Sequence, residues 1–372
     1  MNRIYCYGLI LTLLGGCGKQ GESDLNDVLM KFNESTSQIR KLEYTAHRID
    51  TFAQDGSVWN NTGYALIEKG DEDELFGFSF YCIRDDVPKE YIYQDGIFFE
   101  ISKSDNTYRT ENGHRGIIGM PGGQMIPQTL FQLDSIYSSI SLAINDTNYI
   151  LRYEFEDDTT YFVQNRVKVV EINKDSFFPW RITQTSTVMG NRTYSQTTLS
   201  NIRTNDEVQK SIAGYLANIT NYTAYQPKQL EPNKLLNKNL PSISLPDVLN
   251  QTETVQIQII KLTLIDFWEV WCGPCIASLP KVEELAQAYK SDLEVIGIIS
   301  DDYESAIQLI ENKGISFQNL IGNRKVEEEF NVNSWPRYFL VDKSGIVLKE
   351  YFGFSDQIES DIKHIIESKD VV

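Results

Sequence analysis

Apolar and polar positions follow two different patterns in the first 220 residues. From Leu25 to Leu42 the apolar residues recur at helical spacing, which predicts an amphipathic helix packed on other elements. Short alternating segments follow, and turn signals such as Asp55-Gly56 and Asp95-Gly96 are typical of β-hairpins. Further strands are expected at residues 149–155, 161–172, 180–188 and 192–200, and further helices at residues 126–144 and 206–217. Residues 25–220 are therefore predicted to form an α+β domain, a large antiparallel sheet with helices against one face.

This order of helix, long meander, helix and further meander resembles the LolA-like half-barrel domains of bacterial lipoprotein handling. The resemblance implies a concave sheet face that holds a lipid chain or an apolar protein segment. The alternative is that the sheet only presents the domain that follows it. Cys82 lies in one of the apolar strands, where a lone cysteine is usually a buried small hydrophobe, so we assign it no chemistry.

The pattern changes again after residue 220. Residues 221–239 are polar and contain Pro227 and Pro232, which indicates a linker. From residue 240 onward, continuous apolar runs of strand length alternate with helical stretches, and the chain closes with a hairpin and a helix. The expected strands cover residues 261–268, 293–299, 337–341 and 346–351, and the expected helices cover residues 276–286, 303–313, 326–332 and 358–368. Residues 240–372 are therefore predicted to form an α/β domain.

Composition excludes several classes of function. The chain has 372 residues and a formal net charge of −18, which argues against binding to nucleic acid and against docking on anionic lipid through a basic patch. Five cysteines are too few for a disulfide-stapled scaffold of this length. The three histidines are far apart, and none has metal-site spacing with a cysteine or another histidine, so no metal and no cofactor are expected.

The N-terminus has the features of an export signal. A basic residue, Arg3, precedes an apolar run over residues 4–14 that is too short to span a bilayer. Leu14-Gly15-Gly16-Cys17 then resembles the bacterial lipobox. The resemblance implies that residues 1–16 are a signal peptide, that Cys17 is lipidated, and that residues 17–24 are a polar tether to the membrane. The alternative is a plain secretory signal with an incidental cysteine.

Two further cysteines lie three residues apart where a buried strand meets a helix. Two cysteines at this spacing can close a disulfide within one helical turn, and a CxxC in this position is typical of a redox dithiol. Cys272 is at the helix start, where free backbone N–H groups and the helix dipole favour a thiolate, and Cys275 lies one turn further in. Gly273 and Pro274 fix the turn between them.

The segment from Leu264 to Cys275 resembles the active-site segment of thioredoxins. The resemblance implies the thioredoxin fold and a buried acid, Asp266, which takes the proton from Cys275 through a water. It also places Pro336 at the family's cis-proline position, where the backbone of Trp335 pairs with an extended substrate. Residues Trp271, Gly273, Pro274, Trp335 and Pro336 are accordingly expected to contact the substrate.

The long separation of Cys275 and Pro336 matches the TlpA-like and ResA-like extracytoplasmic branch, and this resemblance covers residues 240–372. Two departures from the family pattern stand out. Trp335 is bulkier than the residues usual before the cis-proline, which alters the set of substrates that fit. The strand over residues 293–299 carries no lysine to pair with Asp266, which affects the tuning of that acid.

Other chemistries for the cysteine pair fit the sequence less well. A zinc site needs two further ligands at suitable spacing, and the sequence offers none. Peroxiredoxins lack a partner cysteine three residues after the reactive one, and a Cys–His hydrolase needs a placed histidine, whereas His364 in the last helix is the only one in this region.

The sequence therefore predicts a lipid-anchored thiol-disulfide oxidoreductase of the bacterial cell envelope that reduces protein disulfides. Its expected partners are disulfide-bearing proteins, a thiol reductant in the membrane that regenerates the dithiol, and the membrane itself through the lipid on Cys17. Nucleic acid is not an expected partner. The alternative is a lipoprotein that carries a lipid or peptide in its N-terminal sheet, with the redox domain as an accessory.

Overall fold

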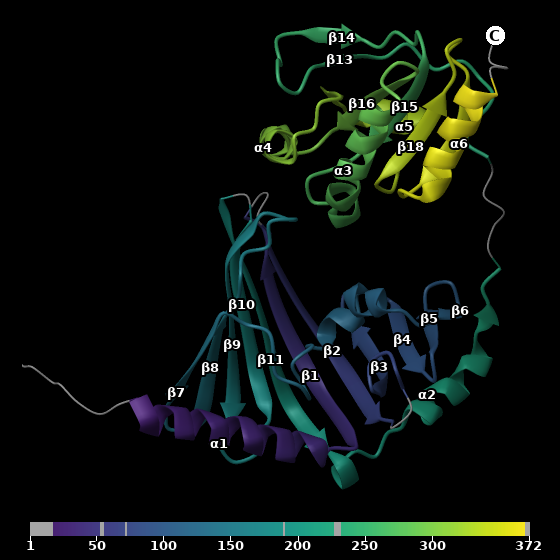
Figure 1. Ribbon diagram of the computed structural model, residues 1–372. Coiled ribbons are helices and arrows are strands. Elements are labelled where there is room, and N and C mark those ends of the chain that lie inside the picture. Colours follow the sequence, from purple (N-terminus) through teal and green to yellow (C-terminus); the bar gives the residue numbers. More distant parts are fainter. Residues whose placement is uncertain (1–17, 53–55, 71–72, 189, 227–231, 369–372) are drawn as a thin grey trace, which may run out of the picture.

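The computed structural model describes residues 18–52, 56–70, 73–188, 190–226 and 232–368. The predicted signal peptide and Cys17 lie outside these residues. Two β-sheets organise the chain, one of twelve strands formed by the N-terminal part and one of five strands formed by the C-terminal part (Figure 1). Among the described residues, no helix has the length and apolar character needed to cross a membrane.

The larger sheet is strongly curved and runs in the order β12-β6-β5-β4-β3-β2-β1-β11-β10-β9-β8-β7 (Figure 1). Neighbouring strands are antiparallel, apart from the short parallel pair of β12 with β6. The strands are β1 (Lys41–Thr51), β2 (Val58–Lys69), β3 (Phe78–Arg84), β4 (Lys89–Gln94), β5 (Ile97–Ser102), β6 (Thr107–Asn112), β7 (Ser139–Ile144), β8 (Asn148–Glu154), β9 (Val163–Asn173), β10 (Pro179–Val188), β11 (Asn191–Thr204) and β12 (Thr223–Ala224). The predicted antiparallel meander is therefore present.

Helices lie on both faces of this sheet, so the prediction that they share one face was wrong. Helix α1 (Gly18–Ser37) places Val28 and Phe32 against strands β8 to β10, on the face that we call the inner face. Helix α2 (Ile212–Ala217) packs against Leu66 and Tyr81, whose side chains point to the opposite, outer face because side chains alternate along a strand. The sheet thus has two cores rather than one.

The prediction of a helix over residues 126–144 was also wrong. Residues 139–144 form the edge strand β7, and the part before it contains no α-helix. The sequence SISLAI alternates polar and apolar residues, and β7 pairs with β8 across a turn in which the side chain of Asn145 accepts hydrogen bonds from the backbone of Thr147 and Asn148. Pro127 further disfavours a helix through this segment.

In the N-terminal part of the chain, the boundaries of two helices also differ from the prediction. Helix α1 begins at Gly18, within the segment expected to be a flexible tether, and ends at Ser37, before β1 starts at Lys41. Helix α2 begins at Ile212 because Ser211 caps it, its hydroxyl accepting a hydrogen bond from the backbone of Gly214. The residues before that cap, Asn205–Glu207, form only a short 3-10 turn.

The segment between β6 and β7 covers part of the inner face. It forms two 3-10 turns, η1 (Arg115–Gly119) and η2 (Gly123–Met125), and buries Ile117 and Met125 against the sheet. A Cβ atom at Gly123 would lie 2.2 Å from the carbonyl oxygen of Ile117, so only glycine permits this close approach. The free thiol of Cys82 lies in the same core, where burial raises its pKa.

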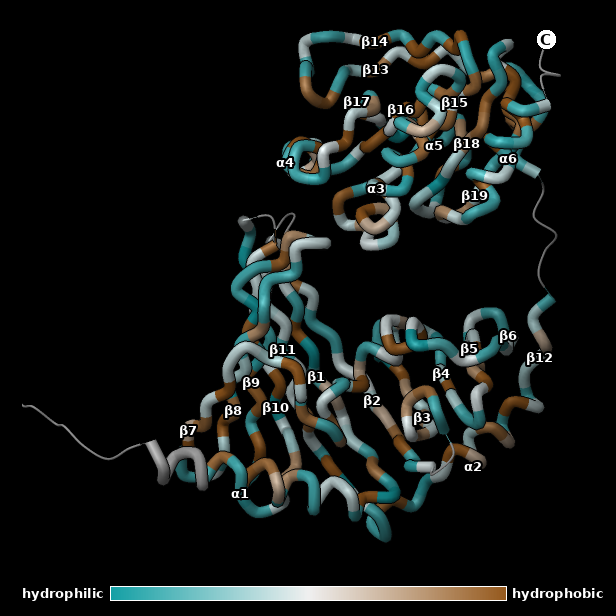
Figure 2. Tube along the Cα trace, viewed as in Figure 1, coloured by the Kyte–Doolittle hydropathy of each residue, from teal (hydrophilic) through white to brown (hydrophobic). Residues whose placement is uncertain are grey.

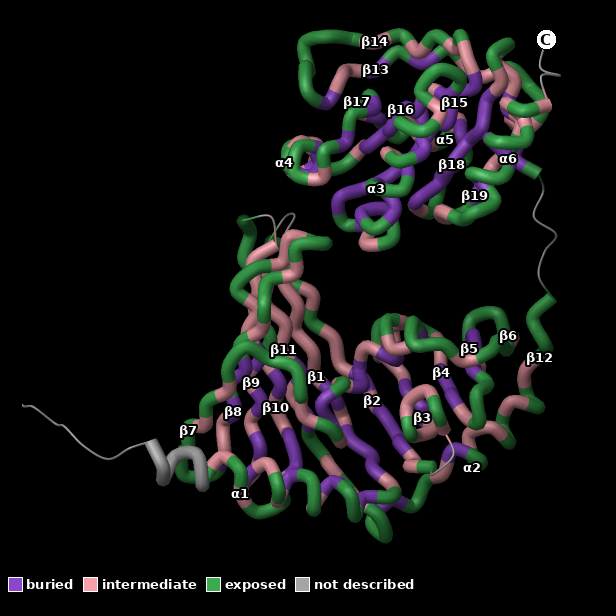
Figure 3. The backbone as a smooth tube through the Cα atoms, in the orientation of Figure 1, coloured by how far each residue is buried: buried purple, intermediate pink, exposed green. Residues whose placement is uncertain are grey.

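The smaller sheet runs in the order β17-β16-β15-β18-β19, with β15, β16 and β17 parallel and β18 and β19 antiparallel. Its elements are β15 (Leu262–Phe267), α3 (Gly273–Ala288), β16 (Leu293–Ile299), α4 (Tyr303–Lys313), β17 (Gln318–Ile321), α5 (Arg324–Phe330), β18 (Arg337–Val341), β19 (Val347–Phe352) and α6 (Asp356–Glu367), preceded by the hairpin of β13 (Ser244–Pro246) and β14 (Thr254–Gln256). The central strands are buried along most of their length (Figure 3). Helices α3 and α6 share a core on one face, and α5 packs on the other.

The C-terminal unit begins before residue 240. Asn233 donates a hydrogen bond to the carbonyl of Phe330, and Leu236 forms a β-bridge with Val347. The two units also touch where the Lys313 ammonium donates to the carbonyl of Thr160 at 2.8 Å and lies over the ring of Phe162. This contact joins the loop between β8 and β9 to the end of α4.

Candidate active site

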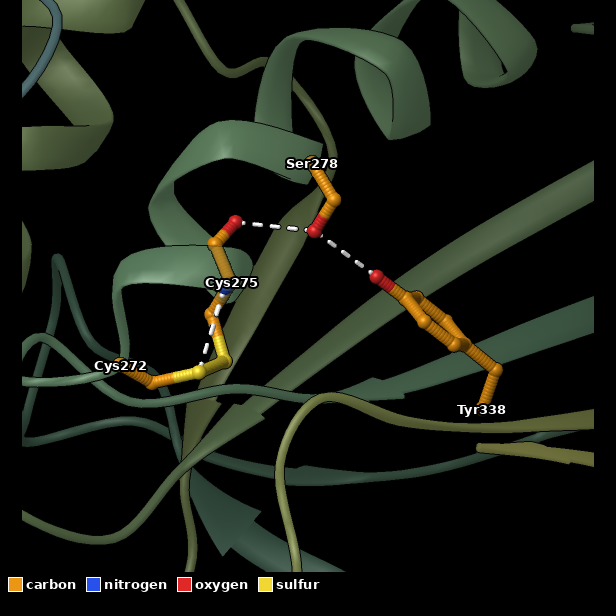
Figure 4. Close-up of a disulfide and its surroundings, with 4 residues drawn as sticks. All are labelled: Cys272, Cys275, Ser278 and Tyr338. Atoms are coloured by element: carbon orange, nitrogen blue, oxygen red, sulfur yellow. Dashed lines mark hydrogen bonds between the residues drawn. A yellow bond between two sulfur atoms is a disulfide. The ribbon is translucent and has the colours of Figure 1, made fainter. Parts of the chain in front are cut away.

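The cysteine pair lies at the start of α3, directly after the buried strand β15. Cys272 has an extended backbone and caps the helix, and its sulfur accepts a hydrogen bond from the backbone N–H of Cys275 at 3.2 Å. The two sulfur atoms form a disulfide of 2.03 Å (Figure 4). Pro274 fits in the first turn because no intrahelical partner is available there for a backbone N–H. The helix start therefore places an N–H donor directly on the sulfur of Cys272.

Asp266 lies at the centre of the sheet beneath this helix. Strand β15 pairs it with Gly297 on one side and Tyr338 on the other, and alternation puts its side chain on the face that α3 covers. Only 1% of the residue is exposed, and neither carboxylate oxygen has a hydrogen-bond partner in the described part of the chain. Burial raises the pKa of Asp266 well above its ordinary value. The predicted buried acid is therefore present, without a basic partner.

Two residues that the sequence analysis did not single out link α3 to β18. The hydroxyl of Ser278 donates to the carbonyl of Cys275 at 2.9 Å and lies 3.0 Å from the hydroxyl of Tyr338 (Figure 4). Both side chains are buried. Burial, and secondarily the charge of Asp266, raise the pKa of the Tyr338 hydroxyl. This chain of hydrogen bonds ties the backbone of Cys275 to the strand beneath it.

A second buried acid, Glu269, was also missed. Its carboxylate accepts hydrogen bonds from the backbone N–H groups of Ser300 at 2.9 Å and Asp301 at 3.1 Å. The residue is 1% exposed, and burial raises its pKa to about 8, against the opposing effect of these two hydrogen bonds. The signal was present in the sequence, because Glu269 interrupts the same apolar run that drew attention to Asp266. Its carboxylate joins the loop before Cys272 to the end of β16.

Aromatic side chains form the rim of the site. Trp271 is 45% exposed and packs edge-on against Trp335, with 5.3 Å between ring centroids. The ring nitrogen of Trp271 donates to Asp301 at 3.4 Å. The peptide bond from Trp335 to Pro336 is cis, and Pro336 is buried. The structure thus brings Trp335 to Trp271, although 64 residues separate them in the sequence.

The donor atoms around the disulfide do not form a metal site. In the ranges that the structure describes, no group of three or more His, Cys, Asp or Glu residues could hold a metal ion. What the site brings together is a disulfide, an N–H donor on one of its sulfur atoms, and two buried acids on the adjoining strand and loop. This combination suits thiol–disulfide exchange, in which sulfur atoms and protons are the reacting groups.

The C-terminal region of the chain is similar in sequence to known redox proteins. A family model described as Redoxin matches residues 235–366. Thioredoxin-like protein YneN of Bacillus subtilis is 24% identical over 146 residues, which cover 38% of this chain and 85% of that protein. Thiol-disulfide oxidoreductase ResA of Bacillus thuringiensis is 27% identical over 156 residues, 40% of this chain and 90% of that protein. A solved structure of a thiol-disulfide oxidoreductase from Bacteroides fragilis is 19% identical with a TM-score of 0.32, covering 34% of this chain and 99% of that one.

Proposed function

Because residues 235–366 form a redoxin domain, we propose that this protein is a thiol-disulfide oxidoreductase of the cell envelope that reduces protein disulfides. The observation that carries the proposal is the pair Cys272 and Cys275 at the start of α3, with an N–H donor on the sulfur of Cys272. A thiolate at this position is stabilised by that donor and by the positive end of the helix dipole.

The reaction proceeds in two exchange steps. In the reduced protein, the Cys272 thiolate attacks one sulfur of the substrate disulfide, and the other substrate sulfur leaves as a thiolate. The Cys275 thiolate then attacks the sulfur of Cys272, which breaks the mixed disulfide and releases the second substrate thiolate. Two electrons pass to the substrate, and the disulfide between Cys272 and Cys275 remains. A membrane thiol reductant returns the pair to the dithiol.

Asp266 acts as the proton acceptor for Cys275 in the second step. Its position beneath α3, its burial and its raised pKa suit a carboxylate that accepts a proton from a thiol. Since neither of its oxygens has a protein partner in the described chain, a water molecule is the fitting relay between acid and thiol. Without this base, the attack of Cys275 on the mixed disulfide should be slower by about 10²-fold or more, the usual contribution of a general base.

The rim of the site binds the substrate. Trp271 and Trp335 present aromatic side chains at the rim, and the half-buried Gly273 and exposed Pro274 follow Cys272, which is itself 5% exposed. The backbone next to Pro336 pairs with an extended substrate segment. Lipid on Cys17 holds the protein at the membrane, which its net charge of −18 would not do.

The reduction potential of the dithiol is the experiment that tests the direction of the reaction. We expect a value near that of thioredoxin, about −270 mV, together with reduction of insulin disulfides by the reduced protein. A value near about −120 mV, typical of a strong oxidant, would contradict reduction as the physiological direction.

A further inference from the structure

A cavity of about 730 Å³ lies on the inner face of the N-terminal sheet, away from the dithiol. Strand register explains which residues line it. Lys168 of β9 pairs with Gln184 of β10, Gln184 with Ser195 of β11, Ser195 with Asp50 of β1, and Asp50 with Trp59 of β2. These five side chains form one row across five strands, and all of them line the cavity. Its volume is within the range of sites that bind small molecules or short peptides.

One wall of the cavity carries two arginines that meet at a single glutamine. Arg48 donates to the carbonyl oxygen of Gln124 at 3.0 Å, and Arg84 donates to the side-chain oxygen of the same residue at 2.7 Å. Arg48 also makes two hydrogen bonds to Asp50, and Arg84 makes two to Asp86 and lies over the ring of Trp59. The bonds of Arg48 use three of the five N–H groups of its guanidinium, so donors remain for a ligand.

The opposite wall is formed by two cations of β9. The ammonium of Lys168 lies 2.8 Å from both oxygens of Asp134, and its side chain is only 9% exposed. Arg166 donates one hydrogen bond to the carbonyl of Glu156, and both cations lie within 6 Å of the ring of Phe155 (5.7 and 5.8 Å). The cavity therefore has a cationic group at each side and an aromatic ring near each group.

The floor between these walls is polar but uncharged. It consists of amide and hydroxyl side chains of β10 and β11, namely Gln184, Ser186, Thr193 and Ser195. Figure 2 shows the change along these strands, whose lower parts are hydrophobic and whose upper parts are hydrophilic. Amide and hydroxyl groups match the hydrogen-bonding groups of a peptide backbone and do not suit an acyl chain. The expected lipid-binding face is thus apolar only where α1 and the segment after β6 already cover it.

Charge identifies the class of ligand. Four cations (Arg48, Arg84, Arg166 and Lys168) and two carboxylates (Asp50 and Asp134) line the cavity, and Asp86 pairs with Arg84 from just outside the lining. Among the described residues Arg166 is therefore the lining cation without a carboxylate partner, and it leaves one positive charge in excess at the cavity of a chain whose net charge is −18. The negative charge of the whole chain repels a long polyanion such as nucleic acid. A short anionic segment in the cavity is affected mainly by the charged side chains that line it. We propose that this cavity binds an extended acidic polypeptide segment, with its carboxylates at the two cationic walls and its backbone over the polar floor. The proposal does not depend on the redox activity.

The test measures the fluorescence anisotropy of a labelled peptide of alternating Glu and Ser, with the full oxidised chain purified in detergent. The control peptide replaces every Glu by Gln. We expect the acidic peptide to bind about tenfold more tightly than the control, and the difference to shrink as salt rises from about 50 to about 500 mM. Equal binding of the two peptides, or no binding of the acidic one, would overturn the proposal.

Variants locate the binding site. Arg166→Gln is expected to weaken acidic-peptide binding about fivefold, because Arg166 is partly exposed and faces the cavity. Arg181→Gln is the matched control, since Arg181 lies on the outer face of β10 and pairs there with Glu171. The double variant R48Q/D50N removes a charge pair without stranding one partner, and should weaken binding about threefold. Thermal melting of each variant checks its folding.

The outcomes separate the proposal from its rivals. Weaker binding in R166Q with unchanged binding in R181Q supports it. Equal losses in these two variants, or no loss in R166Q and R48Q/D50N, would place the peptide elsewhere and overturn it. Displacement of the peptide by succinate or by phosphatidylglycerol vesicles at the same concentration of anionic groups would overturn the polypeptide as the ligand.

Discussion

The buried acids beside the dithiol and the ion pairs of the N-terminal cavity differ in how their charge is compensated, although the redoxin domain also contains a buried ion pair between Arg337 and Glu350. In the redoxin domain, Asp266 has no hydrogen-bond partner in the described chain, Glu269 contacts only backbone N–H groups, and burial raises the pKa of both. In the N-terminal sheet, Arg48 and Lys168 each lie within 3 Å of a carboxylate (2.7 and 2.8 Å). An isolated buried acid is suited to exchanging protons, whereas ion-paired side chains are suited to holding charge for recognition. The comparison predicts that changes at one site leave the intrinsic activity of the other intact, namely insulin reduction at the dithiol and peptide binding in the cavity.

The largest expected effect is the loss of reduction in Cys272→Ser. Without the attacking thiolate, the rate of insulin reduction should fall by at least about a thousandfold, to the rate given by the small-molecule thiol in the assay alone. Binding of the acidic peptide should be unchanged. Cys275→Ser is the matched variant, since it still attacks and should accumulate a mixed disulfide visible on a non-reducing gel. Residual turnover in C272S close to wild type would show that another group carries the reaction.

Asp266→Asn is expected to slow turnover and to stabilise the fold. Removing the base should lower the rate of the second exchange step by about 10². The raised pKa means that folded Asp266 keeps a proton that the unfolded chain releases, so wild-type stability falls as pH rises above about 4. The variant should therefore be more stable than wild type at pH 8 in urea unfolding, and this gain should shrink toward pH 4.

If Asp266→Asn reduces insulin at the wild-type rate throughout pH 6–9, Asp266 is not the proton acceptor. A stability gain that does not vary with pH would instead show that the aspartate was not protonated in the folded state.

Glu269→Gln tests the same property of the active site at a second buried acid, and here the pH range over which stability changes is defined. With a folded pKa of about 8 against an ordinary 4.5, wild type loses stability relative to this variant as pH rises from 4.5 to 8. Over that window the difference in the free energy of unfolding should change by about 2–4 kcal/mol, as measured in urea at fixed salt. The matched control is E284Q, which removes one carboxylate at an exposed position of α3. An unchanged difference across the window would contradict burial of a protonatable acid.

Trp271→Ala should have the smallest effect on the fold. Trp271 is 45% exposed and contacts Trp335 and Asp301 at the surface, so the free energy of unfolding should change by no more than about 1 kcal/mol. Loss of the aromatic face should raise KM for a protein disulfide about threefold to tenfold and leave kcat nearly unchanged. A matching fall in kcat with constant KM would show that Trp271 acts on the reacting sulfur atoms rather than on substrate binding.

Structure was predicted best from the sequence where a single short segment determines it. Helix α4 has the bounds that were predicted for it, because Gly314 ends it in a left-handed conformation. Cys272, Cys275 and Asp266 were found because spacing and an acid within an apolar run are local signals. Ser278 and Tyr338 were not, since their hydrogen bond joins residues 60 positions apart.

The N-terminal sheet was predicted less well for a related reason. Its strands were located, but which face each helix covers depends on long-range register, and the apolar residues of β7 fit a helix or a strand about equally. The cationic cavity was not predicted at all. Its lining comes from six strands and the segment after β6, and each arginine or lysine by itself looks like an ordinary surface residue.

The contact of Thr160 and Phe162 with Lys313 has a consequence for avidity. It places the end of the strand hairpin that carries Arg166 beside α4, and the loop before α4 holds Asp301, which accepts the hydrogen bond of Trp271. For a polypeptide held in the proposed cavity, the effective concentration of its disulfides at the dithiol would therefore depend on whether the polypeptide is long enough to span the two sites. Weak contacts at each site would then suffice to select long acidic substrates over short ones.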